Sequence, residues 1–286
     1  MTSLMRRKLA PGGTLRLGIA CAFLICAGIT AAAHADTRAV EGFDVDEVVL
    51  RGSAELKIVF GDQNRLLIKG SERSLDLEPF YLRGESLRLG RSSSGKSVGS
   101  VKYLLEVEQL ERIVLKGSGE IWVDPVETTS NLESAVEGSG SILMHSVKAD
   151  RLDMEVAGSG AIQLASADVD ELSVELAGSG DVDLGRVIAE RMVVEVAGSG
   201  DVAAARESRE GRVDRIDISI AGSGDVDLAD LIARKVVVSI LGSGDVRVHA
   251  EELLNGNIMG SGDVFYLGDP VVDERSMGSG GISRLD

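Results

Sequence analysis

The chain has 286 residues, of which 46 are acidic and 30 are basic, so its formal net charge is −16. This excess of acid makes nucleic acid and anionic lipid surfaces poor partners. The only cysteines, Cys21 and Cys26, lie near the N-terminus. A disulfide or a cysteine-ligated zinc site in the remaining sequence is therefore excluded.

Residues 1–35 have the composition of a secretory signal peptide. Residues 1–16 hold four basic side chains and no acid, residues 17–33 are uncharged and mostly apolar, and Ala33-His34-Ala35 is a small-x-small cleavage site. The apolar run is short for an uncleaved membrane anchor. We predict cleavage before Asp36, which leaves 26 basic and 46 acidic residues and a net charge of −20. No later segment is long and apolar enough to cross a membrane.

Residues 36–116 alternate apolar and polar side chains without a strict repeat. Strand-like stretches occur at 48–60, 66–71 and 87–89, and a polar loop is expected at 91–97. Aromatic side chains gather here, namely Phe43, Phe60, Phe80, Tyr81 and Tyr103, with Trp122 just beyond. We expect this part to be the N-terminal cap and first irregular coils of one body, because repeat proteins need atypical ends.

Residues 117–286 contain nine copies of Gly-Ser-Gly at a nearly constant interval of about 20 residues. The copies begin at Gly117, Gly138, Gly158, Gly178, Gly198, Gly222, Gly242, Gly260 and Gly278. A constant interval of this length indicates a repeat architecture.

Each repeat has the pattern of a strand with one buried and one wet face. In residues 172–184 the apolar side chains share one parity and the polar ones the other, whereas a helix needs apolar spacings of three and four. The glycines fall on the inward parity, where positive φ or close approach of neighbouring chain is needed. A second apolar group follows, such as Val187 and Ala189, so each unit offers about three short strands joined by bends. Stacking such units predicts an all-β parallel β-helix, or β-solenoid, with about 20 residues per coil.

Two other repeat architectures fit the sequence less well. Calcium-binding nonapeptide repeats have a period of about nine residues, and they place an Asp where this chain has Val182. A β-propeller needs about 40 residues per blade and aromatic signatures, but the whole chain has one Trp, three Tyr and five Phe.

Two irregularities interrupt the repeat. The interval from Gly198 to Gly222 is longer than the others, and the excess is the charged segment 207–212, which we interpret as a solvated loop. Insertions in solenoids also occur at binding faces, so a binding loop is the alternative interpretation of this segment. Few residues follow the last copy, so we expect an incomplete terminal coil.

The motif Gly-Ser-Gly-Asp-Val recurs within the repeats, and a set of strand-like segments precedes it. The motif lies at 178–182, 198–202, 222–226 and 242–246, and the preceding segments run from Phe43 through Ile58, Leu66 to Ile68, Leu87 to Leu89 and Leu110 to Gly119. In order, spacing and motif, residues 43–281 resemble the head GIN domain family, described as adhesin heads of autotransporters with an unsettled function. The resemblance implies a right-handed β-helix in a bacterial envelope protein. It brings no catalytic residues to this chain.

The sequence offers no catalytic, cofactor-binding or metal-binding residues that we would assign. After signal cleavage only His145 and His249 remain, and typical zinc sites need three or four converging ligands. No Gly-x-Ser-x-Gly elbow or Walker loop is present. Phosphate-binding glycine loops lead into a helix, whereas a strand pattern follows each Gly-Ser-Gly here.

An aspartate directly follows five of the motifs, at Asp181, Asp201, Asp225, Asp245 and Asp263. Coils about 4.8 Å apart would stack these side chains in a row. One reading is a strip that binds divalent ions or a cationic polymer. The other, which we prefer, is a solvated acidic edge that keeps the solenoid soluble.

We therefore predict an exported, non-enzymatic cell-envelope protein that serves as an adhesion or interaction module in the periplasm, at the surface or outside the cell. Its expected partner is an envelope, surface or polysaccharide ligand. The alternative is a β-helix carbohydrate-active enzyme of the lyase or hydrolase type. General acid–base chemistry on sugars needs one pair of carboxylates at a defined separation, whereas the charges here follow the coil period, and residues 123–264 lack aromatic platforms.

Overall fold

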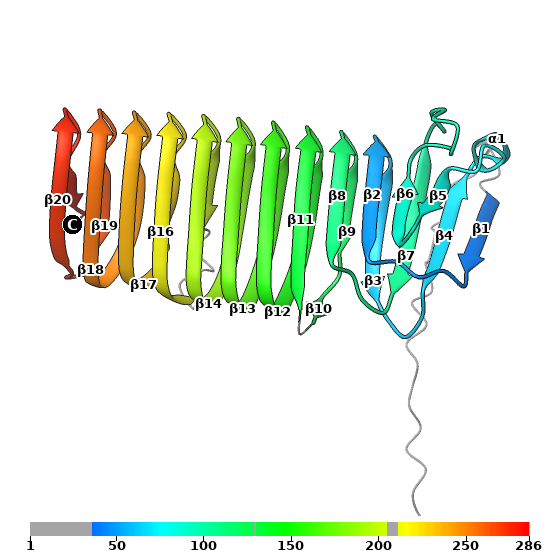
Figure 1. Cartoon of the computed structure of the whole chain (residues 1–286), viewed down its shortest axis with the longest axis horizontal. Coiled ribbons are helices and arrows are strands. Elements are labelled where there is room, and N and C mark those ends of the chain that lie inside the picture. Colours follow the sequence, from blue (N-terminus) through cyan, green and yellow to red (C-terminus); the bar gives the residue numbers. More distant parts are fainter. Residues whose placement is uncertain (1–35, 129, 205–210, 286) are drawn as a thin grey trace, which may run out of the picture. The chain divides into compact units, whose positions relative to one another are not determined.

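The computed structural model describes residues 36–128, 130–204 and 211–285. These residues form a β-solenoid of about eight turns that are about 20 residues apart, with the strands of successive coils side by side (Figure 1). The predicted all-β solenoid is confirmed. The expected signal peptide and most of the charged segment 207–212 lie outside the described residues.

The repeats contribute strands that pair in parallel with the next coil along the chain. They are β8 (Arg112–Gly117), β9 (Glu120–Val123), β10 (Val126–Glu127), β11 (Asn131–Gly138), β12 (Ser141–Gly158), β13 (Ala161–Gly178), β14 (Asp181–Gly198), β15 (Asp201–Ala204), β16 (Arg212–Gly222), β17 (Val226–Gly242), β18 (Val246–Gly260), β19 (Val264–Leu267), β20 (Val271–Gly278) and β21 (Ile282–Arg284).

Each complete coil has three sides, although its strand runs through two of the three corners. In β13 the buried positions change parity at Ala165–Ser166 and again at Asp170–Glu171. The pairing between β13 and β14 skips one residue at each of these two places. The sequence pattern predicted three short strands joined by bends. The bends are tight enough that pairing to the neighbouring coil resumes after one residue.

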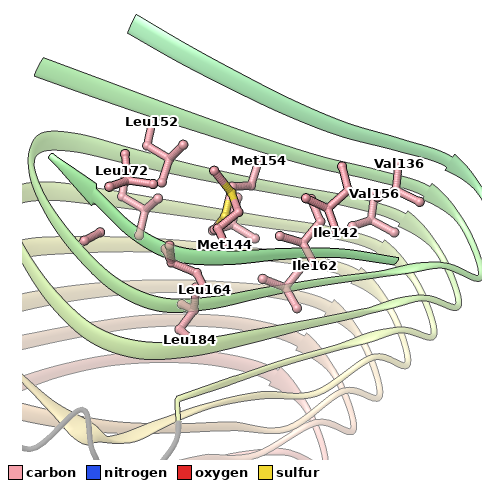
Figure 2. Packing of buried hydrophobic residues seen from close by; sticks show 14 of the residues in the cluster. Val136, Ile142, Met144, Leu152, Met154, Val156, Ile162, Leu164, Leu172 and Leu184 are labelled. Carbon is pink, nitrogen blue, oxygen red and sulfur yellow. The ribbon is translucent and has the colours of Figure 1, made fainter. Parts of the chain in front are cut away.

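The interior is a continuous column of apolar side chains. Figure 2 shows Ile142 beside Ile162 and Leu152 beside Leu172, and Leu164 between Met144 and Leu184. These residues are at most 2% exposed. Because parallel pairing places each residue over its equivalent in the next coil, one inward pattern repeated along the chain builds the whole core.

The two glycines of each motif meet different requirements. Gly178 has φ +131°, and a side chain there would also overlap the carbonyl oxygen of Gly158. Gly180 has no such backbone conformation, but a side chain would overlap the Gly160 carbonyl oxygen and lie 2.7 Å from Cγ1 of Val156. The first glycine is therefore needed for conformation and space, and the second for space alone.

The N-terminal part folds back over the first coil. Its elements are β1 (Asp36–Glu41), β2 (Glu47–Gly52), β3 (Glu55–Phe60), β4 (Arg65–Gly70), α1 (Glu72–Leu75), β5 (Phe80–Arg83), β6 (Ser86–Leu89) and β7 (Val101–Val107). Strand β2 pairs with β8 on one side and with β6 on the other, and β3 likewise lies between β9 and β7. The chain therefore first forms a coil that contains β2 and β3. The following segment reverses direction and places β6 and β7 against the outer edge of that coil, and the chain then continues into β8 on the opposite side.

A buried tyrosine joins the segments of this N-terminal part. The hydroxyl of Tyr103 donates to the carbonyl oxygen of Pro79 at 2.7 Å and accepts from the backbone N–H of Gly90 at 3.0 Å. The side chain is 3% exposed, and burial raises the pKa of Tyr103 to about 12, an effect that the Gly90 hydrogen bond partly offsets.

At the other end, β20 is exposed along its whole length. The inward position of β18 at Gly256 has no side chain, and the side chain of Ile282 fills the space. Ser276 donates to the carbonyl oxygen of Gly280 at 2.6 Å, which secures the corner between β20 and β21. Among the described residues, no helix combines the length and the apolar character that crossing a bilayer requires.

Candidate functional site

Because side chains fill the interior, any site of the described residues has to lie on the outer faces. One open depression of about 420 Å³ lies at a corner of the coils and is lined by Glu111, Arg112, Ser130, Asn131, Glu133 and Asp153. Arg112 and Glu133 already form an ion pair there at 3.0 Å. The outer faces therefore offer extended surfaces rather than an enclosed pocket.

The two histidines of the sequence prediction are not brought together. His145 lies on β12 and His249 on β18, which are not neighbouring strands. Within the parts of the chain that the structure describes, no group of three or more His, Cys, Asp and Glu side chains is placed to hold a metal ion.

The expected row of aspartates, Asp181, Asp201, Asp225, Asp245 and Asp263, does form, and we call it the aspartate ladder. Most of its carboxylates accept hydrogen bonds from the backbone. Each carboxylate from Asp201 onward accepts a hydrogen bond from the N–H of the equivalent residue in the next coil. The pairs are Asp201 with Asp225 at 3.0 Å, Asp225 with Asp245 at 2.8 Å, Asp245 with Asp263 at 2.9 Å, and Asp263 with Gly281 at 2.9 Å. These charge-assisted bonds link successive coils.

The same N–H has another partner in the earlier coils. The N–H of Asp181 donates to the carbonyl oxygen of Gly160, and that of Asp201 to the carbonyl oxygen of Gly180. From Asp225 onward the preceding carboxylate takes over. The aspartate ladder therefore has a structural role that neither sequence-based interpretation, a cation-binding strip or a solvated acidic edge, included.

A second acidic column lies on another side of the coils. Glu155, Glu175 and Glu195 point outward at one register position of β12, β13 and β14. Sequence reasoning did not single them out, although their shared place three residues before Gly-Ser-Gly is visible in the repeats. Both acidic columns are consequences of the coil period.

Ion pairs connect several coils along the corners. Arg151 contacts Glu171 of the next coil at 2.9 Å, and Asp217 accepts from both Arg191 and Arg215. Burial acts to raise the pKa of Asp217, but the guanidinium groups of Arg215 and Arg191 outweigh it and hold that pKa below its ordinary value. These acids are committed to holding neighbouring coils together.

Charge is unevenly distributed along the chain. Residues 36–116 hold 13 basic and 14 acidic side chains, whereas residues 117–286 hold 13 basic and 32 acidic ones. The excess acid of the protein therefore belongs almost entirely to the repeats. A ligand of the repeat faces meets a strongly negative surface unless it lies on a part of them that is locally neutral.

One such part, which we call the neutral strip, lies on the side of the coils that begins after Gly-Ser-Gly. It consists of Trp122, Ser141, Leu143, His145, Ala161, Gln163 and Ala165, all of which point outward and are partly or fully exposed. The strip is free of charge on the two coils that hold residues 141–145 and 161–165, and it ends at Trp122, which lies between Glu120 and Asp124. Sequence reasoning counted Trp122 with the aromatic residues of the cap. The signal that places it outside is parity, because Ile121 and Val123 on either side are buried.

A second unusual surface lies in the last coils. Leu241, Met259 and Met277 occupy one outward register position, and their exposed fractions are 57%, 39% and 70%. We call these three residues the apolar stripe. Exposed apolar side chains that adjoin one another often mark a binding surface.

Comparison with known proteins places this arrangement in a family. A family model described as "Putative auto-transporter adhesin, head GIN domain" matches residues 44–209 and 203–270, which is most of the chain. The chain belongs to this family. The resemblance seen in the Gly-Ser-Gly-Asp-Val motifs is thereby confirmed.

Other structures share the fold of this head GIN domain protein. One from Parabacteroides distasonis, described as a "Putative lipid binding protein", is 28% identical with a TM-score of 0.66 and covers 88% of this chain and 97% of that one. A "putative adhesin" from Parabacteroides merdae is 18% identical with a TM-score of 0.64, covering 88% and 96%. A "putative adhesin" from Parabacteroides distasonis has the same identity and TM-score, covering 88% and 98%. No curated protein matches.

Proposed function

We propose that this protein is an exported, non-enzymatic binding module of the cell envelope, used for adhesion or for contact with a surface ligand. The observation that carries the proposal is the combination of a filled interior with long outer faces, on which equivalent side chains recur at every coil. Such faces suit an extended ligand, because contacts repeat about every 4.8 Å along the solenoid. The family, described as an adhesin head, supports the same reading.

The acidic side chains favour binding over sugar hydrolysis. A glycosidase or lyase needs one pair of carboxylates with distinct roles and separations. Here the aspartates and glutamates occur in columns of equivalent members, and several are engaged by backbone N–H groups or arginines. Equivalent surroundings do not divide two carboxylates into an acid and a base.

The test compares cells of the native host that carry the gene, lack it, or carry it again on a plasmid. We expect cells lacking the protein to bind host or abiotic surfaces less, and complementation to restore binding. Equal adhesion of all three would contradict the adhesive role. In a parallel assay, the purified protein is incubated with plant and bacterial polysaccharides. The appearance of new reducing ends or unsaturated products would favour the enzyme instead.

Lipid binding is a second candidate, supported by the apolar stripe and by the description of the Parabacteroides distasonis structure. Because apolar side chains occupy the interior of the described coils, we expect lipid to contact the outside, at Leu241, Met259 and Met277. Co-sedimentation with zwitterionic vesicles tests this. Binding that is lost in Leu241→Ser/Met259→Ser would support it, and no sedimentation of the unmodified protein would exclude it.

A further inference from the structure

The neutral strip crosses three consecutive coils at one register position. Trp122 of β9 pairs with Leu143 of β12, and Leu143 pairs with Gln163 of β13. Around Leu143 and Gln163 lie Ser141, His145, Ala161 and Ala165, so none of the outward side chains on these two coils is a carboxylate, a lysine or an arginine. On its own coil, Trp122 lies between the outward side chains of Glu120 and Asp124, whose oxygens can accept hydrogen bonds from sugar hydroxyls. Adjacent members are about 4.8 Å apart along the solenoid.

Charged groups mark both ends of the strip. Beyond Trp122, the previous coil presents Lys57, whose ammonium pairs with Asp124 at 3.0 Å. Beyond Gln163, the next coil presents Asp183, with Asp181 two residues earlier. Since residues 117–286 carry 32 acidic and 13 basic side chains, a local absence of charge across the two coils of Leu143 and Gln163 distinguishes this surface from the rest of the repeats.

The side chains of the strip match the chemistry of a sugar ring. An indole face packs against the apolar C–H face of a pyranose, and the adjoining Leu143 extends that apolar contact. The amide of Gln163, the imidazole of His145 and the hydroxyl of Ser141 can both donate and accept hydrogen bonds, as sugar hydroxyls do. A cationic polymer would instead be drawn to the aspartate and glutamate columns, and an anionic one would be repelled by them.

We propose that the neutral strip binds an uncharged polysaccharide, which lies along the solenoid axis with one sugar stacked on Trp122. The inference rests on the proposed binding function and names the ligand class of that function. Single contacts on an open face are weak, so affinity is expected to come from successive sugars that engage successive coils.

The chain offers a direct reporter, because Trp122 is its only tryptophan. The purified protein is titrated with dextran, galactomannan and cello-oligosaccharides, and with polygalacturonate as the anionic comparison, while tryptophan emission is recorded. We expect a saturable change and protection from acrylamide quenching with at least one neutral polymer. No change with polygalacturonate is expected. Absence of a response to every neutral polymer would overturn the assignment, as would equal binding of polygalacturonate.

Variants then separate the strip from binding elsewhere, with calorimetry as a readout that does not depend on tryptophan. Trp122→Phe and Gln163→Glu should each weaken binding at least tenfold. Asn257→Asp is the matched control: it makes the same amide-to-acid change at an exposed position of β18 outside the strip and should leave affinity unchanged. If the protein binds the polymer but neither strip variant weakens it, the strip is not the site, although the proposed binding module stands. Loss of cell adhesion tests that module separately.

Discussion

Replacing the second glycine of a motif should disturb the packing between two neighbouring coils. At Gly200 a side chain would overlap the carbonyl oxygen of Gly180 and lie 2.5 Å from Cδ2 of Leu176. Because backbone on the neighbouring coil cannot yield without shifting its own hydrogen bonds, we expect Gly200→Val to lower the free energy of unfolding by about 3 kcal/mol or more.

Urea unfolding measures this change, and Ser199→Ala is the control. Ser199 lies between the two glycines but is exposed, so its replacement should change stability by no more than about 0.5 kcal/mol. Similar losses in the two variants would show that the motif tolerates a side chain and that the close packing of coils is wrong.

Tyr103 predicts a dependence of stability on alkaline pH. Its folded pKa of about 12 lies above its ordinary value of 10. The stabilisation from the neutral hydroxyl is therefore fully present below pH 10 and is lost as pH rises through 12. A difference of two between the folded and unfolded pKa corresponds to roughly 3 kcal/mol of unfolding free energy.

Unfolding free energies at pH 8 and pH 11.5 test this for the unmodified protein and for Tyr103→Phe. At pH 8 the variant should be less stable by about 1 kcal/mol, because the Gly90 N–H loses its acceptor. Between the two pH values the unmodified protein should lose more stability than the variant. Parallel losses would mean that Tyr103 does not titrate as a buried group.

At the scale of single residues, the sequence predicts which side chains face inward but not which groups their polar atoms bind. Alternation is enough to place Leu172, Val174 and Leu176 inside, and all three are fully buried. The Tyr103 bonds to Pro79 and Gly90 join residues that no local pattern relates. Trp122 was open to prediction, since its buried neighbours fix its direction. The uncharged surface of the two coils next to it is visible only when the coils are aligned by register.

At the scale of elements, the coil is the repeating unit of stability. Deleting residues 178–197 joins Ala177 to Gly198, which preserves the register because Gly178 and Gly198 are direct partners. We expect a folded solenoid one coil shorter and only slightly less stable. Deleting 178–187 instead joins different sides of the coil and exposes apolar residues. Circular dichroism with thermal unfolding distinguishes them, and equal melting temperatures would contradict a 20-residue coil.

The aspartate ladder makes a prediction about hydrogen bonds between coils. Asp225→Ala removes the acceptor of the Asp245 N–H and should cost about 1 kcal/mol, whereas Asp225→Asn keeps an oxygen there and should stay within about 0.5 kcal/mol of the unmodified protein. Urea unfolding measures both. Asp181→Ala is the control, because the N–H of Asp201 bonds to the Gly180 carbonyl instead.

Equal effects of Asp181→Ala and Asp225→Ala would argue that the ladder acts only through charge. The cation reading is tested by the same proteins, with calcium titrated against melting temperature at fixed ionic strength. We expect no specific effect. A saturable rise that disappears when the ladder aspartates are replaced by Asn would establish a cation strip.

The motif spacing predicted a row of aspartates, and the row exists. What the row does was beyond sequence reasoning, because the same motif gives two hydrogen-bonding arrangements. The N–H of Asp201 donates to the Gly180 carbonyl oxygen, whereas the N–H of Asp225 donates to the Asp201 carboxylate. The order of the N-terminal strands was hidden for a different reason. Alternation identifies β2 and β6, but their pairing brings together residues about 40 positions apart, and local patterns carry no information about such partners.

For the whole molecule, the charge distribution decides how copies meet. The repeats hold nearly all of the excess negative charge, so repeat faces of two copies repel one another at low salt. We therefore expect copies of the protein to stay apart at low salt, which leaves the neutral strip and the apolar stripe accessible to other partners.

If these faces act outside the cytoplasm, the protein must be exported, and its location and N-terminus in the native host test this most directly. Fractions of cytoplasm, periplasm, membrane and medium are separated, and the protein is analysed by mass spectrometry. We predict a mature N-terminus at Asp36, in an exported fraction. Finding the protein in the cytoplasm with residues 1–35 intact would contradict the account.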